Sequence, residues 1–204
     1  MSESIQPMLE MRGIRKVFPG VVALDDVDFD VRPGEVHALL GENGAGKSTL
    51  IKIIAGVYRR DGGSMLVDGQ DVDFRSPADA LAQRIKVVYQ ELDLVDGLSV
   101  AENVFLGGYP RTARGFVDFS ALKSRTRALL ADLGLEIDPD LPVGELRVAE
   151  QQMVEIARAL SRQAQLIVMD EPTSALSPAE VDTLFAVIKR LKARGVAIVY
   201  VSHK

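Results

Sequence analysis

Apolar and polar positions alternate along the 204-residue chain with two different periods, which predict strands and helices in turn. Alternation with a period of two predicts strands at 9–18 and 27–31, and short apolar runs predict further, buried strands. The apolar runs are 36–40, 65–67, 85–89, 166–169 and 196–201. Helical apolar spacing predicts the longer helices, which are 47–55, 148–161 and 177–194. This succession of elements is typical of the α/β class, and we expect a mostly parallel sheet with antiparallel strands near the N-terminus.

The middle of the chain has a helical pattern with few β-branched runs. Ser99 and Glu102 have the spacing of a capping box, which marks the start of a helix. We therefore interpret about 95–163 as a helical lobe inserted into a core formed by about 1–94 and 164–204. Because the chain stops after an apolar strand, without a closing turn or helix, we expect it to be truncated at its C-terminus.

Composition limits the chemistry that the chain can carry out. It contains no cysteine, so disulfides, thiolate metal sites and cysteine nucleophiles are excluded. Its two histidines, His37 and His203, exclude a site of several histidines, so any metal must have oxygen ligands, which favours Mg²⁺ or Ca²⁺. The net charge of −5, from 24 basic and 29 acidic residues, argues against a nucleic-acid partner. The longest apolar run, 196–201, is much shorter than the ~18 residues of a membrane-spanning helix.

A glycine-rich turn separates the predicted strand at 36–40 from the predicted helix at 47–55. Its sequence, GENGAGKS at 41–48, fits the pattern G-x-x-x-x-G-K-[ST]. Glycines let successive backbone N–H groups turn inward around a phosphate, and the following helix adds its own N–H groups and positive dipole end. Lys47 can then reach the β- and γ-phosphates, and the hydroxyl of Ser48 can ligate Mg²⁺. The turn therefore predicts a nucleotide-phosphate site.

Two acidic residues follow the predicted buried strand at 166–169. Asp170 and Glu171 lie at the edge where open α/β sheets bind ligands. Asp170 would hold the water shell of Mg²⁺, and Glu171 would polarise the attacking water. Acids at a strand end are common surface residues, so the interpretation depends on the phosphate-binding turn found in the same chain.

With these residues in place, the chain resembles the ATP-binding-cassette ATPases over nearly its whole length. GENGAGKST at 41–49 is similar to their Walker A loop, and LIVMDE at 166–171 is similar to their Walker B strand. The resemblance implies that Gln90 ligates Mg²⁺ and senses a membrane partner, that His203 contacts the γ-phosphate and that Phe18 stacks on adenine. It implies ATP and Mg²⁺ as cofactors. The implied nucleotide-binding residues are Phe18, Gly41, Glu42, Asn43, Gly44, Ala45, Gly46, Lys47, Ser48 and Thr49, the implied metal ligands are Ser48, Gln90 and Asp170, and the implied catalytic residues are Glu171 and His203.

A finer resemblance is to monosaccharide importers of the ribose and galactose type, in KVFPGVVAL at 16–24 and QQMVEIARAL at 151–160. It implies a peripheral ATPase at the cytoplasmic face of the inner membrane that powers sugar import. The implied partners are transmembrane permease subunits, a second cassette in the same full-length chain or in a homodimer, and indirectly a periplasmic sugar-binding protein.

Several positions depart from the family pattern. Val148 and Ala149 stand where the cassette signature has glycines, which sugar-importer cassettes often relax. Arg147 stands where the signature has a serine, and Ser177 stands where many cassettes have an aspartate in the D-loop. Glu171 favours hydrolysis, whereas Arg147 leaves open a nucleotide-binding switch with weak hydrolysis. A soluble cassette without a transport function is a third interpretation, and the acidic net charge disfavours one that acts on nucleic acid.

Overall fold

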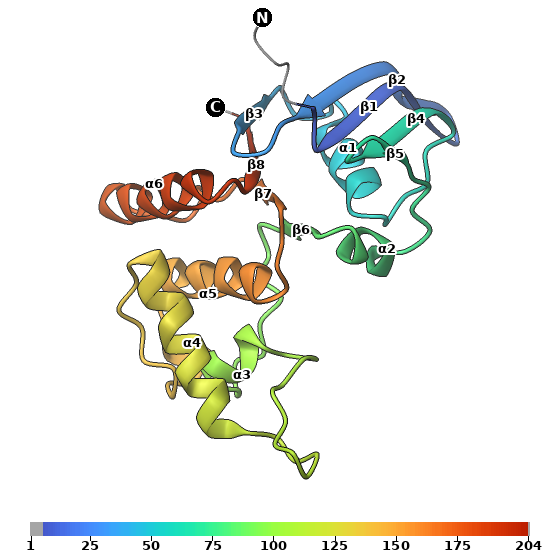
Figure 1. Ribbon diagram of the computed structural model, residues 1–204. Coiled ribbons are helices and arrows are strands. Elements are labelled where there is room, and N and C mark those ends of the chain that lie inside the picture. Colours follow the sequence, from blue (N-terminus) through green and yellow to red (C-terminus); the bar gives the residue numbers. More distant parts are fainter. Residues whose placement is uncertain (1–5, 204) are drawn as a thin grey trace, which may run out of the picture. The chain divides into compact units, whose positions relative to one another are not determined.

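The computed structural model describes residues 6–203, which form two compact units (Figure 1). The first, called here the sheet unit, comprises 6–87, 164–171 and 191–203. The second, called the helical unit, comprises 88–163 and 172–190.

An antiparallel sheet in the strand order β2-β1-β4-β5 forms one layer of the sheet unit. Its strands are β1 (Leu9–Phe18), β2 (Val21–Val31), β4 (Gly62–Val67) and β5 (Gln70–Asp71). The alternation along β1 buries Leu9 and Met11 completely. A shift in register between Met11 and Ile14 bends the strand and leaves Ile14 buried as well.

A second sheet, in the order β3-β8-β7-β6, lies in the same unit. Its strands are β3 (Val36–Leu40), β6 (Ile85–Val88), β7 (Leu166–Asp170) and β8 (Ala197–Ser202). Both β3 and β7 pair with β8 in parallel. Nearly every residue of β7 and β8 is buried, as expected for parallel strands that are covered on both faces.

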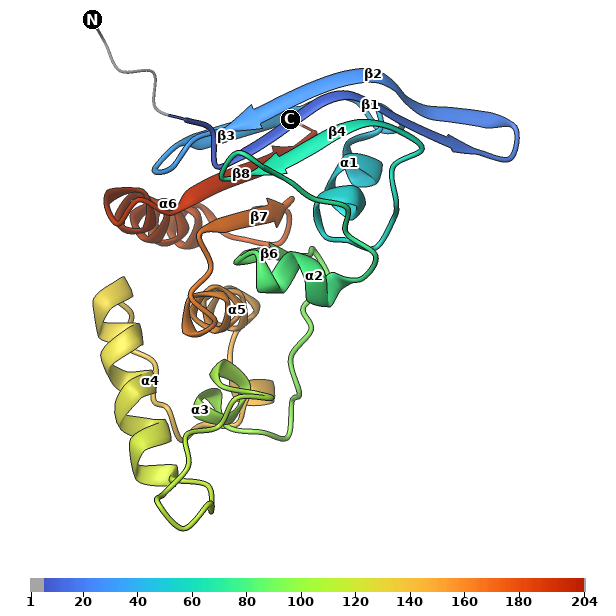
Figure 2. The same cartoon turned by 45° about the vertical axis from the view of Figure 1, so that its right-hand side comes forward.

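Helix α1 (Lys47–Ile54) lies next to the antiparallel sheet in Figure 2. Its four buried side chains, Leu50, Ile51, Ile53 and Ile54, belong to a hydrophobic core that includes residues from both sheets. The shorter helix α2 (Pro77–Ala82) begins where the carboxylate of Asp79 accepts the N–H of Ser76, at 2.9 Å. The hydrophobic core therefore holds the glycine-rich turn before α1 between two fixed elements, β3 and α1.

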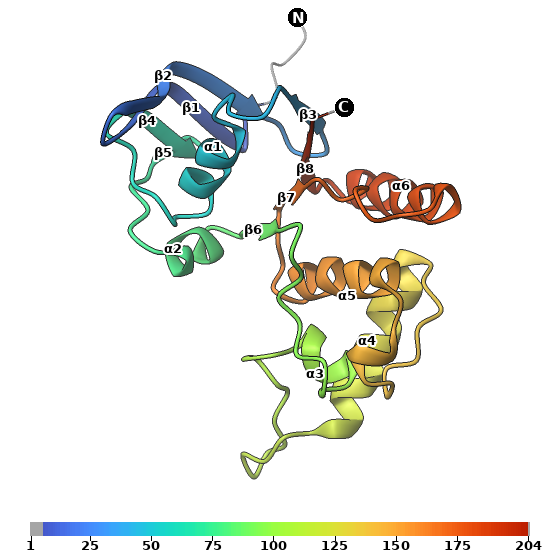
Figure 3. The ribbon, with the colours of Figure 1, turned by 180° about the vertical axis from the view of Figure 1, so that it is seen from behind.

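The helical unit contains α3, α4 and α5, which pack against one another, and most of α6. Figure 3 shows these helices from behind. Their buried faces include Val104, Leu122, Leu130 and Ile156. The bounds are α3 (Val100–Val104), α4 (Phe119–Leu133), a 3₁₀ turn (Val143–Glu145), α5 (Val148–Ser161) and α6 (Pro178–Ala193).

The predicted α/β class with antiparallel strands near the N-terminus is confirmed, and the capping box at Ser99 and Glu102 is also present. The start of the strand predicted at 27–31 is wrong, because β2 already begins at Val21. Val21 pairs with Phe18 of β1 across a tight turn, so pairing extends the strand beyond the alternating region. The predicted strand at 85–89 ends one residue early, at Val88.

The division into a core and an inserted helical lobe stays a prediction. The helical unit differs from the expected lobe in that it also includes 172–190. Within residues 6–203, no helix combines the length and the apolar character needed to cross a membrane.

Candidate nucleotide-binding site

Three neighbouring strands of the parallel sheet end at one edge of the sheet unit. In the register of the sheet, Leu40 of β3 pairs with Ser202 of β8, and Asp170 of β7 pairs with Val201. The glycine-rich turn, Glu171 and His203 follow these three strands directly. Parallel pairing therefore brings together segments that are more than a hundred residues apart in sequence, at the edge where α/β folds bind ligands.

The glycine-rich turn requires glycine at its end. Gly46 has a φ of +86°, and a Cβ atom there would lie 2.7 Å from the carbonyl oxygen of Ala23 and from a methyl group of Leu24. Gly44 also has a φ of +86°, but the space around it is open. The positive φ angles turn the backbone into a concave loop, and the close approach of β2 explains why no larger residue fits at position 46.

The start of α1 has no side chain that accepts hydrogen bonds from its first N–H groups and no acidic residue that offsets its positive dipole end. Gly46 offers no side-chain cap, and the first turn carries no acidic residue. The N–H groups of the first turn therefore present an uncompensated positive end to the cleft, which suits a phosphate. Ser48 and Thr49 lie in this turn and line the same cleft.

Lys47 is folded onto the loop that precedes it. Its Nζ atom donates hydrogen bonds to the carbonyl oxygens of Gly41, at 2.5 Å, and Glu42, at 2.9 Å. These bonds hold the ammonium group at the mouth of the loop. An incoming phosphate would compete with two neutral carbonyls for this charge, and charge-assisted hydrogen bonds to phosphate are the stronger ones.

Asp170 is partly buried at the end of β7. Burial is the largest cause that raises the pKa of its carboxyl above 3.8, and the neighbouring charge of Glu171 raises it further, while Lys47 and Lys52 act in the opposite direction. A divalent cation in the cleft would relieve this unfavourable burial of negative charge. The oxygen donors of Asp170 and Ser48 fit Mg²⁺, which commonly takes one carboxylate and completes its shell with water and substrate phosphates.

Glu171 and His203 form a pair. The Nδ1 atom of His203 lies 2.8 Å from Oε1 of Glu171, with the imidazole as the donor, because an ionised carboxylate can only accept. The backbone N–H of Glu171 donates to the carbonyl oxygen of Val201, at 3.1 Å. Glu171 has a φ of +47°, a conformation that non-glycine residues rarely adopt, and this strained backbone aims its carboxylate into the cleft.

Most of these groups, His203 excepted, line one cleft of about 390 Å³. The lining residues are Val21, Val22, Ala23, Asn43, Gly44, Gly46, Lys47, Ser48, Thr49, Asp170 and Glu171. The cleft therefore combines a concave backbone, an ammonium group, two hydroxyls and two carboxylates. It can bind a phosphate chain with a divalent cation and place a carboxylate beside it.

Several residues expected from the sequence lie outside the set that lines the cleft. Gly41, Glu42 and Ala45 form the outer part of the turn, and the carbonyls of the first two hold Lys47. The ring of Phe18 instead meets the ring of Tyr58 edge-on, with 5.3 Å between centroids. Gln90 is exposed and belongs to the helical unit. His203 is also outside the set that lines the cleft, and it contacts Glu171. The roles of all the expected site residues, including those that line the cleft, stay predictions.

Sequence reasoning missed the apolar wall of the cleft. Val21 and Val22 line it and are 60% and 52% exposed, although both belong to a strand. The sequence does contain a signal for this wall. Two adjacent valines occur where no buried strand was predicted, and such an apolar pair can form a surface for a flat, apolar ligand group.

The turn, the acidic strand end and the parallel sheet are together the features of the class of proteins that have a phosphate-binding loop for nucleoside phosphates. The family model described as "ABC transporter" matches residues 24–174, and the chain belongs to this family.

Relatives and solved structures agree with this assignment. A ribose import ATP-binding protein of Rubrobacter xylanophilus is 56% identical over 98% of this chain. A galactose/methyl galactoside import ATP-binding protein of Salmonella typhimurium is 50% identical over 100% of it. The chain spans 40% and 41% of the length of these two relatives.

Two solved structures show the same fold. The crystal structure of an ATP-binding cassette of an ABC transporter in its ADP conformation has a TM-score of 0.84 and 29% identity, over 98% of this chain and 82% of that chain. The dimeric structure of a bacterial ABC transporter cassette has a TM-score of 0.79 and 26% identity, over 97% of this chain and 88% of that chain.

Proposed function

We propose that this chain binds and hydrolyses Mg-ATP and thereby powers a membrane importer of a monosaccharide. The observation that carries the proposal is the cleft that gathers Lys47, Ser48, Asp170 and Glu171. Two relatives, a ribose import ATP-binding protein and a galactose/methyl galactoside import ATP-binding protein, support the transport part of the proposal.

The residues of the cleft have different roles in the proposed binding of Mg-ATP. The concave turn and the start of α1 bind the phosphates through N–H groups, and Lys47 neutralises charge on the β- and γ-phosphates. Bound Mg²⁺ supplies further charge neutralisation at the phosphate oxygens, held by Ser48 and Asp170. The exposed Val21 and Val22 offer an apolar wall for the base.

Glu171 and His203 supply the groups that act on the attacking water. The carboxylate of Glu171 accepts a hydrogen bond from the water and orients it toward the terminal phosphorus. The imidazole of His203, 2.8 Å from that carboxylate, fixes its rotamer and can turn toward the terminal phosphate. The strained backbone of Glu171 limits the positions that its side chain can take.

We place the permease contact on the helical unit. Its hairpin between α3 and α4 is closed by a 2.8 Å hydrogen bond from the N–H of Thr112 to the carbonyl of Phe116. Phe116 is 73% exposed at the tip of this hairpin, and Phe119 is 54% exposed at the start of α4. Exposed aromatic side chains of this size support a docking surface for a partner subunit.

A second cassette completes the proposed assembly, either in a longer chain or in a homodimer. The dimeric cassette among the structural neighbours supports this arrangement. The proposal places the chain at the cytoplasmic face of the inner membrane, where the permease subunits would hold it and a periplasmic sugar-binding protein would act indirectly.

A switch that binds ATP and hydrolyses it slowly is the second candidate, and Arg147 favours it. Arg147 stands at the start of α5 in place of a signature serine, and its N–H donates to the carboxylate of Glu150 at 2.9 Å. A guanidinium binds phosphate as a charged fork, so a cassette completed by Arg147 would retain ATP without fast turnover.

Release of phosphate from Mg-ATP by the purified chain tests the proposal. We expect turnover that depends on Mg²⁺ and is lost in Lys47→Ala. Tight ATP binding with no turnover, which Arg147→Ser then restores, would instead support the switch. The transport part of the proposal is tested in vesicles that contain the full-length protein and its permease. We expect ATP-dependent uptake of ribose or of galactose. If neither sugar is taken up, the transport part is contradicted.

A further inference from the structure

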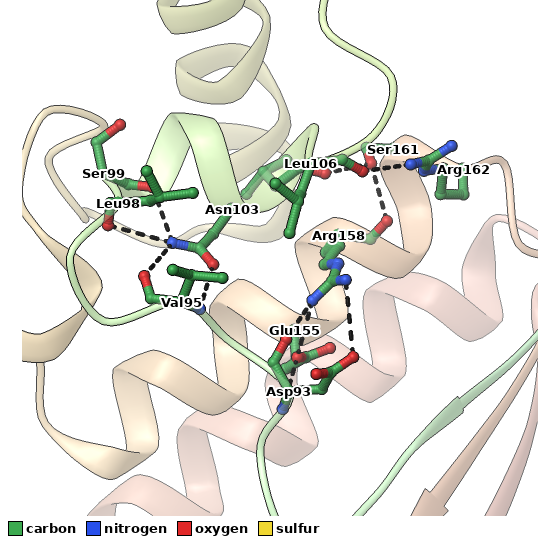
Figure 4. A network of polar contacts seen from close by, with 11 residues as sticks. Asp93, Val95, Leu98, Ser99, Asn103, Leu106, Glu155, Arg158, Ser161 and Arg162 are labelled. Carbon is green, nitrogen blue, oxygen red and sulfur yellow. Dashed lines mark hydrogen bonds and ion pairs between the residues drawn. The ribbon is translucent and has the colours of Figure 1, made fainter.

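Helix α5 and its C-cap residue present a row of polar side chains along one face. Glu155, Arg158 and Ser161 of the helix and the C-cap residue Arg162 follow the three- and four-residue spacing that brings side chains to one side of a helix. Figure 4 shows these side chains pointing toward the segment 93–106, which continues from the Gln90 loop into α3.

All four side chains bind backbone atoms of this segment. Oε1 of Glu155 accepts the N–H of Asp93 at 3.1 Å, and the guanidinium of Arg158 donates to the carbonyl of Asp93. At the other end, Oγ of Ser161 donates to the carbonyl of Val104 at 2.6 Å, and the guanidinium of Arg162 donates to the carbonyl of Leu106 (Figure 4). The helix therefore fixes the path of the segment at both ends.

Asn103 fixes the bend between these ends. Its side chain is fully buried, and its Oδ1 accepts the N–H of Val95 at 2.8 Å. The two hydrogens on its Nδ2 are shared among the carbonyls of Val95, Leu98 and Ser99, at 3.1, 3.2 and 3.1 Å. One amide thus closes the loop on itself through four backbone groups, three of which are carbonyls that also accept a backbone N–H.

A buried carboxylate is costly unless it is paired, so its presence in this row calls for a reason. Glu155 is 3% exposed, and Nη1 of Arg158 lies 3.4 Å from its Oε1. An apolar residue at position 155 would avoid the desolvation of a carboxylate, but it could not accept a hydrogen bond. The carboxylate instead supplies an acceptor for the N–H of Asp93, three residues after Gln90.

We propose that Glu155, Arg158 and Asn103 are positioning residues for Gln90. They hold the segment 93–98 against α5, so that the loop carrying Gln90 and the helix α5 move as one body. The part of this inference that concerns catalysis rests on the proposed function and on the Mg²⁺-ligand role that the family resemblance implies for Gln90, whereas the fixing of the loop depends on neither.

Amide hydrogen exchange on the whole chain tests the fixing directly. In Glu155→Leu we expect exchange at 93–98 to rise about tenfold or more, because the N–H of Asp93 loses its acceptor and the loop opens locally. Glu155→Gln keeps a hydrogen-bond acceptor but loses the negative charge, so we expect amide exchange at 93–98 to rise about threefold. Asn103→Leu should give the same pattern as Glu155→Leu if the two residues serve one loop.

Thr126→Val is the matched control. Thr126 is also fully buried in the helical unit, and its hydroxyl donates to the carbonyl of Leu122 within α4, at 2.9 Å. We expect this variant to leave exchange at 93–98 unchanged. Unchanged exchange at 93–98 in folded Glu155→Leu, or an equal rise in Thr126→Val, would overturn the proposal.

Steady-state ATP hydrolysis tests the consequence for Gln90. Because Glu155 acts on the Gln90 loop and not on the phosphate-binding turn, Glu155→Leu should lower kcat about tenfold and leave the Kd for ATP within about twofold. A rise in KM with kcat unchanged would overturn the positioning role. If the wild-type chain hydrolyses no ATP, the proposed function fails, and the exchange experiment still decides whether these residues fix the loop.

Discussion

At its position after the glycine-rich turn, Lys47 has two roles, one in the structure of the turn and one in the proposed binding of phosphate. Its ammonium group holds the turn together through the carbonyls of Gly41 and Glu42. The same charge is proposed to bind phosphate. The charge that organises the loop is therefore also the charge that a phosphate needs.

Removal of this charge gives the first prediction. In Lys47→Ala we expect the affinity for Mg-ATP to fall by about 100-fold or more, because a phosphate loses its charged donor and the turn loses two hydrogen bonds. Isothermal titration with Mg-ATP measures the effect. Lys189→Ala, which removes an exposed lysine of α6, is the control. Equal affinities for all three proteins would contradict the assignment.

Glu171 carries the second prediction. In Glu171→Gln the side chain keeps its size and can still bind water, but it cannot accept a proton. We expect ATP binding within about threefold of wild type and a loss of turnover of about 10²–10⁴-fold. Phosphate release under saturating Mg-ATP measures it. Turnover within a factor of about two of wild type would exclude Glu171 from the proposed role.

Among the elements, α3 has a cap whose strength depends on pH. The hydroxyl of Ser99, and then its N–H, lower the pKa of Glu102 below 4.5, since both donate to its carboxylate, at 2.6 and 2.9 Å. A carboxyl with a lowered pKa in the folded state stabilises the protein above its unfolded pKa, and this stabilisation is lost as the pH falls through the folded pKa.

Ser99→Ala is therefore expected to destabilise the protein by about 0.5–2 kcal/mol at neutral pH. The difference from wild type should shrink well below pH 4.5, where Glu102 becomes protonated in both proteins. Urea unfolding at the two pH values measures this, with the exposed Ser124→Ala of α4 as a control. A difference that is independent of pH would show that the hydroxyl acts without the carboxylate.

The elements that the sequence predicted well are those with a local cause. The bounds of β1, β3 and α5 follow from alternation, from an apolar run and from helical spacing. The N-terminal extension of β2 depends on pairing with β1, which no local pattern encodes. In helix α4 the buried leucines are interrupted by the buried Thr126, which weakens the apolar pattern in the sequence, and the bounds of this helix were not predicted.

The residues of the candidate site also fall into those that a local pattern predicts and those that depend on the fold. The turn at 41–48 and the acids after β7 were predictable, because phosphate binding by glycine-rich turns and acids at strand ends have short sequence patterns. The pairing of Glu171 with His203 depends on the order of strands in the sheet, and the contacts of Asn103 depend on the fold of a loop. The sequence contains these residues but no pattern that joins them.

At the scale of the whole molecule, the proposed function predicts association that depends on nucleotide. ATP that is bound but not hydrolysed should hold two cassettes together, so Glu171→Gln with Mg-ATP should elute from gel filtration as a species of twice the mass. The double variant Lys47→Ala, Glu171→Gln should elute as the monomer under the same conditions. A monomer of Glu171→Gln with ATP shown to be bound would contradict the proposed closure of two cassettes.

The row of polar side chains on α5 has a consequence for how the chain tolerates mutation. Because α5 and Asn103 bind N–H and C=O groups, the identity of most side chains between 93 and 98 is of little importance to the path of the loop. The side chain of Asp93, for example, is 84% exposed. Proline is the exception, since it removes the N–H that Glu155 or Asn103 binds. In a saturation screen for folded protein, positions 93 and 95 should therefore accept nearly every residue except proline, whereas positions 103 and 155 should accept few.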